Sequence, residues 1–196
     1  MSLVKTRAAD DTPADLLATD NAGQGKGPVR SGMAPDLSFD ELLRYTNEER
    51  EKWRRWFQLH PEAMDTALQP DGRFPTVGKL IDHVFLVERR HLQRLTADPV
   101  SESSGLTGNN APPLFDYGAS VRRELEQFAG LIDEDDASEP RTFVVRDQQV
   151  VMSPRKLLFH IVIHEIRHWA QIALAVRLAG LEPPGDHDLF SSRALR

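Results

Sequence analysis

Apolar residues recur at steps of three and four along four segments of the chain, which is the period of a helix with one buried face. The segments are 38–60, 76–96, 112–132 and 153–179. Each is long enough for five or more helical turns. We therefore predict an all-α fold, a four-helix bundle whose apolar stripes face a common interior.

Residues typical of helix ends support the assignment of these helices. Ser38 followed by Glu41 is a capping box, and Ser153 followed by Pro154 is an N-cap with proline in the first turn. Gly180 supplies a C-terminal stop. The acidic run at 133–136 is expected to end the third helix.

Between the third and fourth helices the pattern changes. Residues 142–152 hold β-branched runs on either side of a polar turn, which predicts a short hairpin or extended insert. Residues 1–35 are rich in small and polar residues and bury too little apolar surface to order alone. We predict a flexible N-terminal tail over 1–35, or an arm that orders only against a partner subunit, and one bundle domain over 36–196.

Charged residues on the helices are expected to face solvent. The mixed-sign run at 48–56 predicts a solvated face with Trp53 and Trp56 turned inward, and Glu88 is expected to point outward. Glu165 falls about 100° from its neighbour His164 around the helix, which predicts a position at the surface or behind the metal ligands.

Three histidines stand out in the last helix. His160, His164 and His168 lie four residues apart inside an apolar run, and the last two fall on the inward seam. Imidazoles one turn apart on a helix can reach the same cation. Histidine titrates near neutral pH and is costly to bury unless its ring nitrogens find a partner, which a divalent metal would provide.

The second helix offers a third ligand. His83 lies on its inward stripe, which also carries Val87 and His91. Three histidine ligands leave a coordination position open for water or substrate, as in catalytic rather than structural sites. We predict a divalent metal site formed by His83, His164 and His168. The other histidines, His60, His91 and His187, are expected to be ordinary core or surface residues.

Three further residues are candidates for supporting a metal ligand or for contacting a substrate. His160 is predicted to line the cavity or support a ligand rather than to be a fourth ligand. Gln171 continues the inward seam one turn beyond His168. There its amide is expected either to find a hydrogen-bond partner or to serve only in packing. Glu165 is the third.

The segment His164-Glu165-Ile166-Arg167-His168 also matches the H-E-x-x-H pattern of zinc peptidases, in which the glutamate is the general base. The extended form of that motif fails, because Leu174 stands where a third histidine belongs. Little chain remains after residue 180 for the rest of a peptidase domain. The peptidase is the weaker alternative.

Composition limits the possible metal ligands, the possible partners and the expected location of the protein. The chain has no cysteine, so nitrogen and oxygen must supply any metal ligands. A formal net charge of −6 argues against a nucleic-acid partner. No apolar run is long enough for a membrane span, and no secretory signal is evident, so we expect a cytoplasmic protein without a membrane partner.

Two segments resemble a known family. Residues 74–90, with Asp82-His83-Val84, are similar to the second helix of the DinB-like, damage-inducible proteins. Residues 159–172 resemble the last helix of that family, although Trp169-Ala170 replaces the usual Arg-Gly after the final ligand. The resemblance spans about residues 36–192.

The resemblance implies a homodimeric bundle in which His83, His164 and His168 hold one nickel or zinc ion. Characterised relatives are metal-dependent transferases or isomerases that use low-molecular-weight thiols. The resulting hypothesis is a metal-dependent thiol S-transferase or hydrolase-like enzyme that acts on a small molecule, with such a thiol as co-substrate. The alternative from another class is a non-catalytic, metal-stabilised stress-response binding protein.

Overall fold

The structure is a computed structural model that describes residues 36–68 and 72–195. The tail predicted over 1–35 lies outside the described residues. None of the described helices combines the length and apolarity that a membrane crossing requires.

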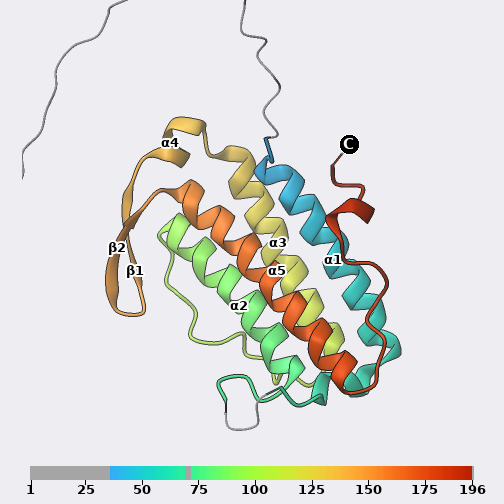
Figure 1. The fold of residues 1–196 in the computed structure, drawn as a ribbon. Coiled ribbons are helices and arrows are strands. Elements are labelled where there is room, and N and C mark those ends of the chain that lie inside the picture. Colours follow the sequence, from blue (N-terminus) through green and yellow to red (C-terminus); the bar gives the residue numbers. More distant parts are fainter. Residues whose placement is uncertain (1–35, 69–71, 196) are drawn as a thin grey trace, which may run out of the picture. The chain divides into compact units, whose positions relative to one another are not determined.

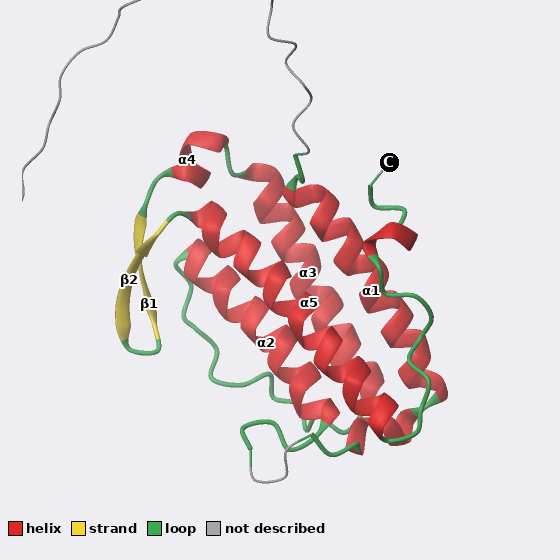
Figure 2. Ribbon diagram, viewed as in Figure 1, coloured by secondary structure: helices red, strands yellow, loops and turns green. Residues whose placement is uncertain are grey.

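The described chain is mostly helical, with one small two-stranded sheet, as the sequence predicts (Figures 1 and 2). The long helices are α1 (Phe39–Leu59), α2 (Val77–Thr96), α3 (Ala111–Leu131) and α5 (Pro154–Leu178). The shorter elements are η1 (Pro61–Asp65), α4 (Glu134–Ser138), β1 (Arg141–Val145), β2 (Gln148–Met152) and η2 (Leu189–Ser191). Each long helix begins and ends within a few residues of its predicted bounds.

The predicted caps are present. The Ser38 hydroxyl accepts a hydrogen bond from the backbone N–H of Glu41, whose carboxylate in turn accepts from the Ser38 N–H. Ser153 accepts from the N–H of Lys156 in the same way. These side chains satisfy backbone donors that the first turn of a helix leaves unpaired.

The acidic run after α3 does more than end that helix. Asp133 accepts a hydrogen bond from the N–H of Asp136 and caps the short helix α4, which the pattern of apolar residues does not predict. Glu134, Asp135 and Asp136 occupy its first turn, where the helix dipole favours negative charge.

The hairpin lies beside the C-terminal part of α2 and the start of α5 (Figure 1). Its strands pair antiparallel from Arg141 opposite Met152 to Val145 opposite Gln148. Arg146 and Asp147 form the two-residue turn, and both have positive φ, as this tight turn requires. Arg94 Nε on α2 donates to the carbonyl of Val144 at 2.7 Å, which ties the hairpin to the helix.

Two apolar clusters form the interior. One contains Trp53, Phe85 and Trp169, and the other contains Leu125 and Ile161, with further residues from the same helices in each. Burial of these side chains is the main favourable contribution to the fold.

A layer of buried charged residues separates the two clusters. In each long helix, one residue of this layer stands in the sequence between the residues of one cluster and those of the other. Each helix contributes one residue, and all four are less than a tenth exposed. They are Arg50 of α1, Glu88 of α2, Arg122 of α3 and Glu165 of α5. Both arginines pair with both glutamates.

This layer corrects three expectations. Arg50 lies in the run predicted to be solvated, Glu88 was expected to point outward, and a surface position was one of the two expected for Glu165. All three are buried, and Glu88 and Glu165 are 1% exposed. The physical reason is mutual neutralisation: a charge can be buried when an opposite charge and hydrogen bonds replace its hydration.

The segment after α5 runs back along α1 (Figure 1). Trp56 Nε1 donates to the carbonyl of Glu182 at 2.8 Å, and the Tyr45 hydroxyl donates to the carbonyl of His187 at 2.6 Å. Side chains of α1 thus hold the backbone of this segment in place.

Candidate metal centre

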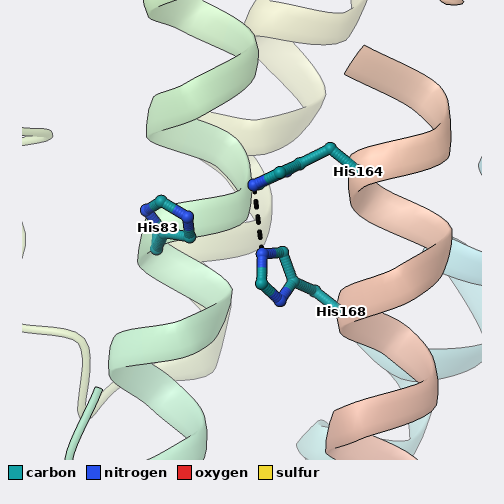
Figure 3. Close-up of side chains that lie close together, drawn as sticks. All are labelled: His83, His164 and His168. Carbon is teal, nitrogen blue, oxygen red and sulfur yellow. Dashed lines mark hydrogen bonds between the residues drawn. The ribbon is translucent and has the colours of Figure 1, made fainter. Parts of the chain in front are cut away.

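The structure brings His83, His164 and His168 together. His83 extends from α2, while His164 and His168 extend from successive turns of α5 toward it (Figure 3). Ring nitrogens of all three lie within 4.8 Å of one another, so the three side chains could hold one metal ion. All three are partly buried.

The two histidines of α5 are the closest pair. Their Nε2 atoms lie 3.0 Å apart, and their ring centroids are separated by 4.3 Å. Nitrogens bound to one tetrahedral zinc ion at about 2.0–2.1 Å are roughly 3.3 Å apart. The spacing of this pair therefore fits a shared ion, and the His83 ring lies 5.1 Å from that of His164 and 5.3 Å from that of His168.

Gln171 orients one of these rings. Its Oε1 lies 2.6 Å from Nδ1 of His168, one turn further along α5. An amide oxygen accepts a hydrogen bond, so Nδ1 of His168 carries the proton and Nε2 keeps a free lone pair. Hydrogen bonds of this kind fix the tautomer of metal-binding histidines.

The three imidazoles are neutral at neutral pH. Burial, with a smaller effect from the facing His168, lowers the pKa of His83 to about 4. Burial likewise lowers the pKa of His164 to about 3, and it lowers the pKa of His168 although the bond to Gln171 opposes the shift. Because a metal binds only the unprotonated ring, little proton competition remains near pH 7.

Phe74 covers one side of the cluster. Its ring centroid lies 4.4 Å from that of His83 and 6.3 Å from that of His168. An aromatic wall at this position excludes water from part of the site and contributes to the burial that lowers both pKa values.

His160 and His91 lie next to the cluster. The rings of His160 and His164 are 5.8 Å apart, and His91 of α2 packs edge-on against His160 at 5.3 Å. Both line the same cavity as His83 and His164. His160 thus lies where a cavity-lining residue was expected.

His91 was expected to be an ordinary residue, and its proximity to the site was missed. It is 8% exposed, and its Nδ1 is buried without a hydrogen-bond partner among the described residues. The sequence does hold a signal for this proximity: His91 lies on the inward stripe of α2, two turns after His83.

Glu165 points away from the histidines. Its carboxylate accepts hydrogen bonds from Arg50 Nε at 2.5 Å, Arg122 Nη2 at 2.6 Å and Trp169 Nε1 at 2.9 Å. The flanking arginines lower the pKa of this carboxyl despite its burial. A carboxylate held by two guanidinium groups is a poor proton acceptor, so the H-E-x-x-H spacing gives no support to a peptidase.

A comparison with protein-family models finds the DinB family over residues 33–194. The chain belongs to the DinB family. None of the curated proteins compared with the chain matches it. Membership in the DinB family and the three-histidine cluster are together compatible with a metal-binding protein.

Proposed function

We propose that this DinB-family protein is a metal-dependent enzyme of the thiol S-transferase or hydrolase-like kind, with His83, His164 and His168 as the ligands of one divalent ion. One observation carries the proposal. Three neutral imidazoles from two helices converge on one point, and two of them, His83 and His164, line a cavity of about 590 Å³.

The donor set favours nickel or zinc, because imidazole nitrogen suits both and no thiolate is available. A bound ion of this kind acts as a Lewis acid and lowers the pKa of a thiol or water on its open position. Gln171 holds the His168 ring with Nε2 directed toward His164. The cavity volume lies in the usual range for small-molecule sites.

The four-helix-bundle architecture belongs to the same proposal. It is supported by the neighbours of the long helices: α1 and α2 each pack against both α3 and α5. The homodimer and the cytoplasmic location stay predictions. Light scattering on purified protein would test the first, and fractionation of the source cells would test the second.

Metal binding is tested first. Protein prepared without a histidine tag and stripped with a chelator should bind one equivalent of zinc or nickel in a calorimetric titration. His164→Ala should lower that affinity by about a hundredfold or more, because a three-nitrogen site loses one ligand. His60→Ala is the matched control, since His60 lies at the end of α1 outside the cluster.

Turnover is tested next. The metal-loaded protein is incubated with glutathione, bacillithiol or mycothiol and a panel of electrophiles, and product is measured by mass spectrometry. We expect thiol transfer that disappears in His164→Ala. Turnover that survives this substitution would rule the mechanism out, and tight metal binding without any turnover would favour the non-catalytic binding protein.

A further inference from the structure

The cavity beside the histidines is bounded by helix α2, the hairpin and helix α5. His83, His164, His91 and His160 form part of its wall. The described lining also holds six basic residues and no acidic one. The basic residues are Arg73, Arg90, Arg94, Arg146, Lys156 and Arg167.

None of these six basic side chains pairs with a carboxylate of the described residues, whereas several arginines elsewhere do. Arg90 and Arg94 are instead held by carbonyl oxygens: Arg90 donates to Ser101 and Glu102, and Arg94 to Val144. A carbonyl fixes the direction of a guanidinium group without cancelling its charge. These two cations are therefore positioned but not neutralised.

This concentration of positive charge runs against the chain as a whole, whose formal net charge is −6. A concave surface of one sign raises the local concentration of ligands of the opposite sign. Arginine is suited to this task because its planar fork binds carboxylate and phosphate oxygens in pairs.

His91 gives a second, independent observation. It lines the same cavity, is 8% exposed, and has a buried Nδ1 without a partner among the described residues. A buried polar atom without a partner is unfavourable, and most such atoms in proteins are satisfied by a group or water. His91 therefore brings a polar ring with one unpaired nitrogen to the wall of this cavity.

We propose that the cavity binds a small molecule with carboxylate or phosphate groups, held by the arginines of α2, the hairpin and α5, with its reactive end beside His83, His164 and His168. This deepens the proposed function and rests on it: the arginines select and orient the substrate, and the histidines would hold the ion that activates the thiol or water. Fixed orientation of this kind lowers the entropic part of a reaction barrier.

The test measures anion binding separately from metal binding. Full-length protein, in metal-free and zinc-loaded form, is titrated at low salt with succinate, with inorganic phosphate and with succinamide, the uncharged analogue of succinate. Calorimetry and the shift in Tm are the readouts. The stronger of the two anions assigns the cavity to carboxylate or to phosphate.

Two exposed basic residues are removed together, Arg146→Asn and Arg167→Gln. Asparagine is chosen at 146 because that position has a φ of 51°, which asparagine tolerates. Arg55→Gln with Arg123→Gln removes the same charge from exposed positions that do not line the cavity. Melting curves without ligand verify that both variants fold.

We expect saturable binding of succinate or phosphate in both forms of the protein and no binding of succinamide. The cavity variant should bind the anion about tenfold more weakly or worse, and the control variant should match the wild type. The proposal is overturned if neither anion binds although zinc does, or if both double variants bind the anion equally. Failure to bind zinc would instead count against the proposed function.

Discussion

Arg50 and Glu165 form a two-point ion pair in the middle of the protein: Nε of the arginine donates to one carboxylate oxygen at 2.5 Å, and Nη2 donates to the other at 2.9 Å. Arg50 comes from α1 and Glu165 from α5, which are far apart in the sequence. The pair therefore links two helices within the interior, and its side chains are almost fully buried.

Glu165→Gln should destabilise the protein strongly. The substitution leaves Arg50 and Arg122 with a single buried carboxylate between them, and breaking a buried ion pair costs about 3–5 kcal/mol. Urea unfolding followed by circular dichroism would measure the loss. Glu51→Gln is the control, because the exposed pair of Glu51 and Arg55 is worth at most about 1 kcal/mol. Equal losses in the two variants would contradict the assigned role.

Gln171→Leu should weaken metal binding while the fold is kept. The amide oxygen holds the His168 ring by its Nδ1, and loss of such a supporting bond typically costs about 10–100-fold in metal affinity. Zinc titration of the purified variant measures the effect. Gln127→Leu, at an exposed position on α3, should bind zinc like the wild type. Unchanged affinity in Gln171→Leu would show that the bond does not orient a ligand.

His91 should make stability depend on pH. Burial, with smaller effects from Arg94 and His160, lowers its pKa to about 3, while the unfolded chain binds this proton near 6.5. Between these values the unfolded state holds more protons, so the stability that neutral His91 allows is present above pH 6.5 and is lost as pH falls toward 3. His91→Phe should therefore lose less stability than the wild type between pH 6.5 and pH 4.

Chemical unfolding of metal-free protein at a series of pH values would measure this difference. His60→Phe, which changes a partly buried histidine outside the cavity, serves as the control. Parallel curves for the wild type and His91→Phe would show that His91 does not titrate as its burial requires.

Gly118→Ala should destabilise the contact between α3 and α2. A β-carbon at position 118 would lie 2.8 Å from the ring of Phe85, closer than side-chain atoms pack, and overpacking of this kind costs about 1–3 kcal/mol. Gly130→Ala is the contrasting variant on the same helix, where an added β-carbon meets nothing within 4 Å. It should be neutral or stabilising by up to about 1 kcal/mol, since alanine favours helix over glycine.

Thermal melts of the two glycine variants would settle the comparison. If Gly118→Ala were as stable as Gly130→Ala, α2 and α3 would be able to move apart at this contact without losing stability.

The sequence by itself determined the four long helices, their approximate ends and the hairpin. Local rules suffice for these features, because a capping box at Ser38 or a proline after Ser153 acts within one turn of chain. The helical spacing of His164 and His168, and the inward position of His83, were likewise enough to predict that the three rings approach one another.

Only the tertiary structure decided where the charges lie. A hydrophobic pattern assigns Arg50 and Glu88 to solvent and allows Glu165 a surface position, because it holds no information on the opposite charges from other helices that replace their hydration. The same holds for the cationic cavity. Arg94 of α2, Arg146 of the hairpin and Arg167 of α5 are separated along the chain, and only packing of the three elements gathers their charge around the histidines.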